Sequence, residues 1–324
     1  MSEKVPFGRY FMSGLWVFPV FIILFSSVSI ASWDTSIVDK PKVFGEITDR
    51  AVVRDSSGIL HMAYVGNALF HARFDGERWS YEIVDSGIES GGHASIASGM
   101  NRSLHIVYYD GIGSDLKYAL FDGDVWDISV VDSEYRVGGY TSIRCDQEGN
   151  PHISYHDFTN GALKYAVKNS AGWIVTVVDA QGTAGAYSSL VLDPDDTPHI
   201  SYFMDADHIL KHATYTENFW AVSTVDTMFN AGRGSSIALS KNNEPAISYT
   251  AGNPVSMVRF AYMSPLGWRI DDVYEESDLS YETSLIFDQD DNPAISFHGA
   301  ACDLKIARRN KGSWSVTDID DRPG

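Results

Sequence analysis

Cysteine and basic residues are scarce in this chain. Only two cysteines, Cys145 and Cys302, occur in 324 residues, so a framework of several disulfides is excluded and one bridge between the two is the most that can form. Lysine and arginine number 24 against 43 Asp and Glu, which gives a formal net charge of −19. This balance argues against a nucleic-acid-binding face, which needs clustered basic residues, and against adhesion to anionic membranes.

Long apolar runs are also lacking, apart from one stretch near the N-terminus. Residues 15–25 are apolar, which is short of the roughly 20 residues that a membrane-spanning helix needs. Lys4 and Arg9 precede this stretch, and Ser29-Ile30-Ala31 resembles a cleavage site. We therefore expect residues 1–31 to be an export signal, with an uncleaved anchor as the alternative. The exported protein would be periplasmic, secreted or bound to the cell surface, with no further membrane contact.

Helical periodicity is absent after residue 32, and a repeat takes its place. Tryptophan recurs at intervals of 46 to 48 residues, at positions 33, 79, 126, 173, 220, 268 and 314. The same four short runs with alternating polarity return around each tryptophan, and turn residues such as Asp-Gly and Asn-Pro separate them. The clearest set comprises residues 140–143, 151–155, 163–166 and 173–179. Four strands repeated at this spacing predict the blades of a β-propeller; we name the strands of each blade a, b, c and d in chain order.

The number of repeats predicts the number of blades. Six a–b–c sets are present, but seven d-type strands, because an extra one occurs at residues 33–39. We expect an all-β fold: a single six-bladed propeller of four-stranded antiparallel blades over residues 32–324. Either the Trp33 strand or the Trp314 strand would close the ring. Seven blades are the alternative, but they would require an a–b–c set that is missing.

The repeated phrases also resemble those of a known group. Pro-His-Ile-Ser-Tyr at residues 151–155 and Leu-Lys-Tyr-Ala at residues 163–166 resemble the repeats of secreted prokaryotic β-propellers, over about residues 33–320. The chain is loosely similar to the sialidase-like superfamily too, but the Ser-x-Asp-x-Gly-x-x-Trp boxes of sialidases do not occur. The resemblance implies the architecture and no single activity, since such propellers include lectins, hydrolases, lyases and interaction platforms.

Residues that recur in every unit are expected to serve the unit. We expect the tryptophans to pack the blades together. The four histidines that begin strand b should form structural hydrogen bonds, because they lie on four different blades and are too far apart to share one metal ion. The lysines of strand c and the aspartates that end strand d are expected to form pairs of little individual value. The recurring histidines are His61, His105, His152 and His199, and the recurring basic and acidic residues are Lys117, Lys164, Lys211, Lys305, Arg259, Asp85, Asp132, Asp179 and Asp226.

Residues that differ between units are the candidates for a functional site. The d–a and b–c loops lie on one face of a propeller and vary most here, so we expect a ligand at the mouth of the axial channel on that face. The turns of the opposite face are short and repetitive. At the start of strand a the register positions are Asp49, His93, Tyr140, Tyr187, Gly234 and Glu282. The b–c loops contribute Asp110, His156, Asp157, Asp205 and His298, and the d–a loops contribute Arg136 and Arg233.

Two kinds of function fit these residues. In a binding protein, Tyr140 and Tyr187 would present flat faces to a glycan or a protein, and the other side chains would donate and accept hydrogen bonds. In an enzyme, Asp49 and Glu282 would serve as general acid and base of a glycoside hydrolase, or His93 or His156 would act with Tyr140 in a polysaccharide lyase. We favour a monomeric binding module that needs no cofactor. A calcium ion beside Asp49 and Glu282 is the alternative.

Overall fold

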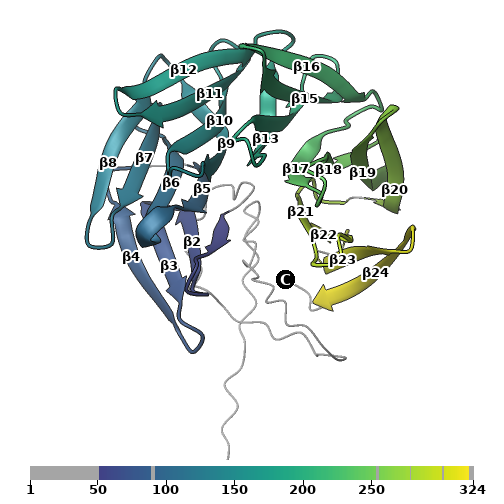
Figure 1. Ribbon diagram of the computed structural model, residues 1–324, viewed down its shortest axis with the longest axis horizontal. Coiled ribbons are helices and arrows are strands. Elements are labelled where there is room, and N and C mark those ends of the chain that lie inside the picture. The colour runs from purple at the N-terminus through teal and green to yellow at the C-terminus, as the bar shows by residue number, and fades with distance from the viewer. Residues whose placement is uncertain (1–50, 89–91, 253–254, 278, 301–302, 321–324) are drawn as a thin grey trace, which may run out of the picture.

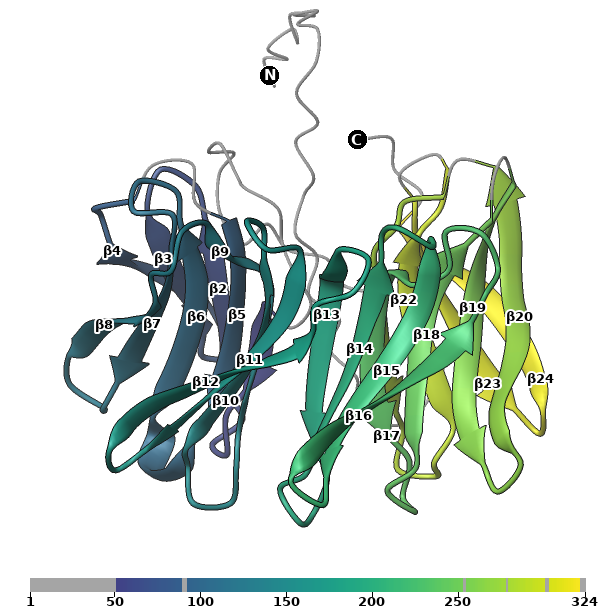
Figure 2. The same cartoon turned by 90° about the horizontal axis from the view of Figure 1, so that it is seen from above.

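The computed structural model describes residues 51–88, 92–252, 255–277, 279–300 and 303–320, and it confirms the six-bladed propeller. These residues form six four-stranded antiparallel sheets arranged around an axis (Figure 1). Within each sheet the strands follow chain order from the axis outward, so strand a is innermost and strand d is outermost. Figure 2 shows the sheets from the side, with the d–a and b–c loops along the upper edge.

The first three blades contain the N-terminal half of the described chain. Blade 1 contains β1 (Val52–Arg54), β2 (Leu60–Val65), β3 (Leu69–Phe74) and β4 (Trp79–Asp85). Blade 2 contains β5 (Gly92–Ser98), β6 (Leu104–Asp110), β7 (Asp115–Phe121) and β8 (Trp126–Asp132), with the 3-10 turn η1 (Met100–Arg102) between β5 and β6. Blade 3 contains β9 (Val137–Cys145), β10 (Pro151–Asp157), β11 (Ala162–Asn169) and β12 (Gly172–Asp179).

The last three blades follow the same plan. Blade 4 contains β13 (Ala184–Leu192), β14 (Pro198–Met204), β15 (Ile209–Thr216) and β16 (Phe219–Asp226). Blade 5 contains β17 (Arg233–Leu239), β18 (Pro245–Ala251), β19 (Val255–Ser264) and β20 (Gly267–Ser277). Blade 6 contains β21 (Thr283–Phe287), β22 (Pro293–His298), β23 (Leu304–Asn310) and β24 (Ser313–Asp320). The Trp314 strand is therefore the outermost strand of the last blade, whereas the Trp33 strand lies outside the described residues.

Acidic residues organise the turns between strands a and b. In blade 3, Asp146 Oδ1 accepts hydrogen bonds from the backbone N–H groups of Glu148 (2.9 Å) and Asn150 (2.7 Å). The equivalent carboxylates Asp193 and Asp288 accept the same pair of bonds in blades 4 and 6. These bonds fix a tight turn that connects two antiparallel strands. Within the described residues no group of three or more His, Cys, Asp or Glu side chains is placed to hold a metal ion.

The recurring aspartates join neighbouring blades, which corrects the expectation of weak pairs. The aspartate that ends strand d accepts a hydrogen bond from a strand-b tyrosine of the next blade, in the pairs Tyr108–Asp85, Tyr155–Asp132, Tyr202–Asp179 and Tyr249–Asp226, at 2.6 to 2.7 Å. A strand-c cation of that next blade reaches the same carboxylate: Lys117, Lys164, Lys211 or Arg259. We call this triplet the blade joint. Its members are largely buried, so removing the aspartate leaves the tyrosine hydroxyl without its acceptor and takes one carboxylate away from the cation.

The tryptophans pack between blades, as expected. Five of them contact edge-on the strand-c side chain of the preceding blade, at centroid distances of 5.0 to 5.4 Å, in the pairs Trp126–His71, Trp173–Tyr118, Trp220–Tyr165, Trp268–His212 and Trp314–Phe260. The strand-b histidines also have the structural role that was predicted. Each ring is hydrogen-bonded to the strand-c residue of its own blade, which is His71, Tyr118, Tyr165 or His212.

Two predictions from the sequence concern residues that the structure does not describe. The expected export signal at residues 1–31 and Cys302 are outside the described residues. Cys145 is a free thiol whose pKa burial raises to about 12. In the described part of the chain no helix has the length and apolarity to cross a membrane.

Candidate functional site

The innermost strands of blades 2 to 5 begin with the same unusual backbone conformation. His93, Tyr140, Tyr187 and Gly234 occupy equivalent positions, and their φ angles of 55°, 49°, 52° and 56° lie in the left-handed region. The carbonyl of each accepts a hydrogen bond from a hydroxyl of the next blade: Thr141 bonds to His93, Ser188 to Tyr140 (2.6 Å), Ser235 to Tyr187 (2.8 Å) and Thr283 to Gly234 (2.7 Å). The conformation therefore serves the contact between blades through the backbone alone.

Glycine at one of these positions shows that the scaffold does not require a side chain there. A Cβ atom on Gly234 would lie 1.5 Å from the carbonyl oxygen of Tyr281, so only glycine fits in blade 5. Left-handed backbone is unfavourable for residues with a Cβ, and single cases persist where something else maintains them. The imidazole and phenol rings of blades 2 to 4 are therefore additions to the repeat, which is the property expected of functional residues.

These three rings lie side by side. The His93 and Tyr140 ring centroids are 4.7 Å apart, and those of Tyr140 and Tyr187 are 4.8 Å apart. Phe158, from the b–c loop of blade 3, lies within 6.2 Å of His93 and 6.4 Å of Tyr140. Gly139 makes room for it, because a Cβ atom at that position would come within 2.3 Å of the Phe158 ring. We call His93, Tyr140, Phe158 and Tyr187 the axial aromatic cluster.

An arginine lies at each end of this cluster. The Arg136 guanidinium lies 4.3 Å from the centre of the Phe158 ring, in cation–π geometry. At the other end, the Tyr187 ring is 6.2 Å from that of Phe203, and Arg233 lies over Phe203 at 5.4 Å and over Tyr281 at 4.8 Å. The structure thus brings six residues predicted from the sequence into one continuous surface, and it adds Phe158 and Phe203, which were not predicted. The six are His93, Tyr140, His156, Tyr187, Arg136 and Arg233.

The two histidines of this surface are held neutral. Burial, together with the nearby His156 and Arg136, lowers the pKa of His93 to about 4. Burial also lowers the pKa of His156, whose Nδ1 donates a hydrogen bond to the carbonyl of Ala184 at 2.8 Å. The His156 ring contacts Phe158 edge-on at 4.9 Å. At neutral pH the positive charge of this surface therefore comes from the arginines.

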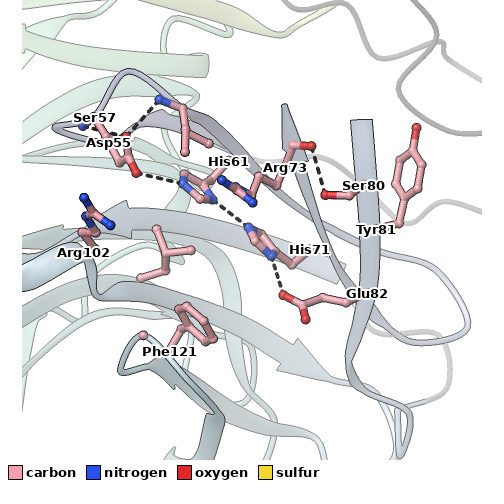
Figure 3. A pocket seen from close by; sticks show the side chains of 13 residues that line it. Asp55, Ser57, His61, His71, Arg73, Ser80, Tyr81, Glu82, Arg102 and Phe121 are labelled. Atoms are coloured by element: carbon pink, nitrogen blue, oxygen red, sulfur yellow. Dashed lines mark hydrogen bonds and ion pairs between the residues drawn. The ribbon is translucent and has the colours of Figure 1, made fainter. Parts of the chain in front are cut away.

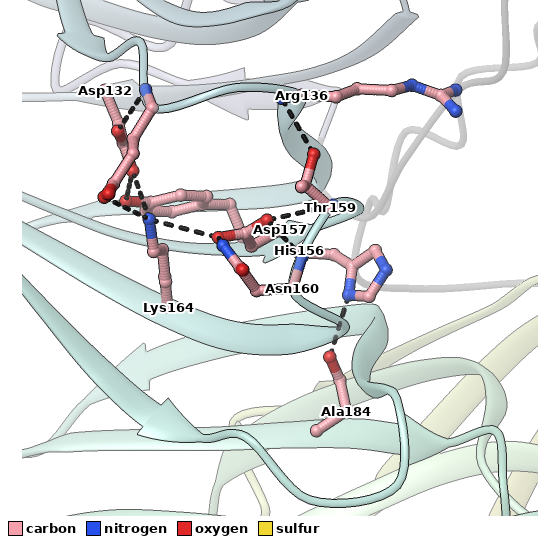
Figure 4. Close-up of polar contacts among 10 residues, drawn as sticks. Asp132, Arg136, His156, Asp157, Thr159, Asn160, Lys164 and Ala184 are labelled. Carbon is pink, nitrogen blue, oxygen red and sulfur yellow. Dashed lines mark hydrogen bonds and ion pairs between the residues drawn. The ribbon is translucent and has the colours of Figure 1, made fainter.

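Asp110 and Asp157 serve their loops instead of the surface. Asp157 is fully buried: its Oδ1 accepts hydrogen bonds from the backbone N–H groups of Thr159 and Asn160, and its Oδ2 pairs with Lys164 at 3.2 Å. Figure 4 shows Arg136 extending on the same side as His156, away from Lys164. Burial acts to raise the pKa of Asp157, but hydrogen bonds from Asn160 and Lys164 outweigh it and lower the pKa. Asp110 is likewise paired with Lys117 at 2.8 Å. We therefore assign both carboxylates to the loops and not to a ligand.

Four predicted residues remain: Asp49, Asp205, Glu282 and His298. Asp49 lies outside the described residues, so the carboxylate pair expected for a hydrolase is not defined. Glu282 and Asp205 are exposed on their loops. His298, in blade 6, is half-buried, and burial lowers its pKa.

The structure also contains a concave site that the sequence did not reveal. A pocket of about 510 Å³ lies between blades 1 and 2, at the a–b and c–d turns, on the face opposite to the axial aromatic cluster (Figure 3). Its walls include His71 and Glu82, which replace the Tyr and the Ser or Thr that blades 2 and 3 carry at the same positions. Glu82 was the available signal, because blades 2, 3 and 4 carry Ser129, Thr176 and Ser223 at its position, whereas the histidine at position 71 recurs in blade 4 as His212.

Comparison with known proteins identifies the architecture. The chain matches no protein-family model and no curated protein sequence. It is similar to the solved structure of the BP39L lectin from Burkholderia pseudomallei, with a TM-score of 0.70, 13% identity and 90% of each chain covered. It is also similar to Aleuria aurantia lectin in complex with Fucalpha1-6GlcNAc (TM-score 0.57, 14% identity, 86% and 96% covered).

A solved enzyme shows a comparable likeness. A PL25 ulvan lyase bound to a GlcA(1-4)Rha3S saccharide aligns with a TM-score of 0.54 and 14% identity, over 84% of this chain and 78% of the lyase. At such identities the comparisons show the fold, and the chain is a six-bladed β-propeller similar in architecture to propeller lectins and to this lyase.

Proposed function

We propose that the protein is a carbohydrate-binding propeller whose ligand lies on the axial aromatic cluster. The observation that carries the proposal is the row of His93, Tyr140 and Tyr187. Their rings lie next to one another on left-handed backbone that the scaffold needs, while the glycine in blade 5 shows that the rings themselves are not needed. Arg136 and Arg233 flank the row.

The chemistry of this surface suits a sugar. A pyranose ring has an apolar C–H face, which stacks on aromatic rings, and an edge of hydroxyl groups, which accept hydrogen bonds from donors such as guanidinium. Two adjacent phenol rings and a neutral imidazole offer a strip of aromatic surface. The two guanidinium groups at its ends provide donors. The ligand class is therefore an oligosaccharide that spans several rings.

The lectin neighbours support the same proposal, since two of the solved structures with this fold are sugar-binding proteins. Export through residues 1–31, which we also propose, would bring the protein to extracellular or surface glycans. A monomer provides the complete surface, because the cluster comes from blades 2 to 4 of one chain and the flanking Arg233 comes from blade 5 of the same chain.

Catalysis at the same surface is the second candidate, and the likeness to the ulvan lyase favours it. A lyase needs a group that removes a proton next to a carboxylate and a group that protonates the leaving oxygen. The axial aromatic cluster contributes His93 and two phenols, with the pKa of His93 lowered to about 4. This imidazole is a weaker base than an ordinary histidine, so we favour binding.

A glycan array with the purified chain tests the proposal directly, with the bound sugars then analysed for cleavage. Binding without cleavage is the expected result. Cleavage of the bound sugar would replace the lectin-like function by a lyase or hydrolase. If no glycan on an array that includes neutral and acidic oligosaccharides binds above background, the proposal is contradicted.

A further inference from the structure

The pocket between blades 1 and 2 contains a chain of hydrogen bonds that no other blade has among the described residues. His61 Nε2 lies 3.3 Å from Asp55 Oδ2, and His61 Nδ1 lies 2.9 Å from His71 Nε2. His71 Nδ1 lies 2.8 Å from Glu82 Oε1, which also accepts a hydrogen bond from Trp126 Nε1 at 3.1 Å. Figure 3 shows this chain along one wall of the pocket.

These three hydrogen-bonding contacts need one more proton than the side chains supply when both histidines are neutral. The contacts Asp55–His61, His61–His71 and His71–Glu82 each need one proton, but two neutral imidazoles supply only two. A third proton completes all three bonds and makes one imidazole cationic. The charged groups that face the pair are Asp55 from the β1–β2 turn, Arg73 from β3 and Glu82 from β4.

Burial lowers the pKa of both histidines, so the third proton binds at a lower pH than an ordinary histidine requires. The matching pair in blade 4, His199 and His212, lacks this arrangement. Ser223 stands at the position of Glu82, and Asp193 is 3.9 Å from His199.

Two guanidinium groups of this pocket have no partner in the described part of the chain. Arg73, on β3, and Arg102, in η1, both line the pocket. Neither guanidinium makes a hydrogen bond or an ion pair with a described residue, in contrast to Arg259, which is paired with two aspartates. The two arginines come from different blades, Arg73 from blade 1 and Arg102 from blade 2. Arginine is the side chain best suited to planar recognition of carboxylate, sulfate or phosphate groups.

We propose that this pocket binds an acidic saccharide unit, with the anionic group on Arg73 and Arg102. Its volume of about 510 Å³ lies within the usual range of small-ligand sites. The half-buried Phe121 ring, in the c–d turn region of blade 2, also lines the pocket and offers an apolar face to a sugar ring. The hydroxyl groups of Ser57 and Ser80 line it as well, and they match the hydroxyl edge of a sugar.

The charges of the pocket favour one negative charge on the ligand. Arg73 and Arg102 carry two positive charges, and Asp55 and Glu82 carry two negative charges. When the hydrogen-bonded pair His61 and His71 takes up the third proton, the net charge of the pocket becomes +1. A sugar with one negative charge neutralises it. Affinity is therefore expected to rise as the pH falls through the range in which the histidines titrate.

Calorimetric titration of the full chain tests this site with three probes. A galacturonic acid tetramer carries carboxylates, a sulfated galactose tetramer carries sulfate esters, and a neutral galactose tetramer is the reference. We expect at least one acidic probe to bind at least about tenfold more tightly than the neutral one, and which of them binds identifies the anion. Arg73→Gln and Arg102→Gln should each weaken that binding about tenfold, since each removes charge-assisted hydrogen bonds.

Matched controls separate this site from its surroundings. Arg78→Gln removes the same charge from the same blade, at a side chain that is 85% exposed and not in the pocket, and it should leave the affinity unchanged. His71→Tyr installs the residue of blades 2 and 3 and should abolish the gain in affinity between about pH 8 and about pH 5. Tyr140→Gly should leave binding in this pocket intact, so this inference does not depend on the function proposed for the axial aromatic cluster.

Three outcomes would overturn the inference. The first is equal binding of the neutral and acidic tetramers. The second is an affinity for the acidic tetramer that neither Arg73→Gln nor Arg102→Gln reduces. The third, from a titration with a glutamate-rich peptide as a fourth probe, is tighter binding of the peptide than of any of the saccharides, which would assign the pocket to a protein partner.

Discussion

Tyrosine has different roles in two regions of this propeller, the blade joints and the axis. At the blade joints, Tyr202 and its equivalents donate to a buried aspartate of the preceding blade, and the same contact recurs at four joints. At the axis, Tyr140 and Tyr187 stand at a position where blade 2 has histidine and blade 5 has glycine. The first pattern repeats because it holds adjacent blades together, and the second varies because the scaffold does not depend on the side chain at that position.

The last joint shows how far the repeated pattern can change while its purpose remains. Between blades 5 and 6, Tyr274 stands at the aspartate position and Phe297 at the tyrosine position, and their rings lie 5.4 Å apart. Two aromatic rings replace a hydrogen bond between buried polar groups, and Lys305 pairs with Asp318 of its own blade instead. Both solutions leave no buried charge without a partner. A position that joins adjacent blades in one repeat does so in the next even when its residue type changes. The equivalent position therefore identifies a structural residue better than the residue type does.

The largest expected effect comes from breaking a joint. Asp179→Ala removes the acceptor of the Tyr202 hydroxyl and the partner of Lys211. Because the aspartate side chain is only 6% exposed, we expect a loss of about 3–5 kcal/mol in the free energy of unfolding, measured by urea denaturation. Asp195→Ala, on an exposed turn, is the matched control and should change stability by less than about 0.5 kcal/mol. Equal losses for the two variants would contradict the role of the joint.

A smaller loss is expected when a packing aromatic is removed. Trp173 is half-buried and contacts Tyr118 of the preceding blade at 5.1 Å. Trp173→Ala should reduce the free energy of unfolding by about 3 kcal/mol, at the lower end of the range for large aromatic residues because part of the ring is exposed. The glycan affinity of the folded variant should remain unchanged. A loss below about 1 kcal/mol would show that the tryptophan is not a packing residue.

The buried histidines should make stability depend on pH. Burial lowers the pKa of His105 to about 4 and that of His212 to about 3, so these rings stay neutral in the folded state while the unfolded chain takes up protons below about pH 6.5. Stability is therefore expected to fall as the pH falls from about 6.5 toward 4, by up to about 1.4 kcal/mol per pH unit for each such histidine. Urea denaturation at a series of pH values measures this slope.

A paired variant tests the cause of that slope. His199→Ala combined with His212→Phe gives blade 4 the residues of blade 5, where Ala246 and Phe260 stand and Phe260 packs on Trp314 at 5.3 Å. The variant should keep its packing on Trp268 and show a shallower dependence of stability on pH. An unchanged slope would mean that other groups cause the acid sensitivity.

The fold could be predicted from the sequence because each blade is specified locally. Period-2 alternation, Asp-Gly and Asn-Pro turns and the recurring tryptophan mark four strands within about 47 residues, and β10 and β12 lie where those patterns place them. The roles of Asp179 and Lys211 were not predicted, because spacing along the chain does not show which strand of the next blade a side chain reaches. Their recurrence suggested a structural role, and only the structure shows that they join different blades.

The candidate sites could be predicted only in part, for the same reason. Register along strand a identified His93, Tyr140 and Tyr187, since these residues differ at one repeated position. Phe158 was missed because it follows the strand in a loop that has no fixed register. The pocket between blades 1 and 2 was missed because it combines departures from the repeat in β3 and β4 with a loop of the next blade. None of these departures indicates a cavity by itself.

Measuring glycan affinity and unfolding free energy together for Tyr140→Gly and Tyr202→Phe tests the comparison most directly. Tyr140→Gly gives blade 3 the residue of blade 5 at a φ of 49° that glycine adopts without strain, so stability should change by less than about 1 kcal/mol while glycan affinity falls about tenfold. Tyr202→Phe leaves Asp179 without its hydroxyl donor, so stability should fall by about 1–3 kcal/mol while affinity stays the same. The opposite pattern, with affinity lost in Tyr202→Phe and retained in Tyr140→Gly, would contradict the account.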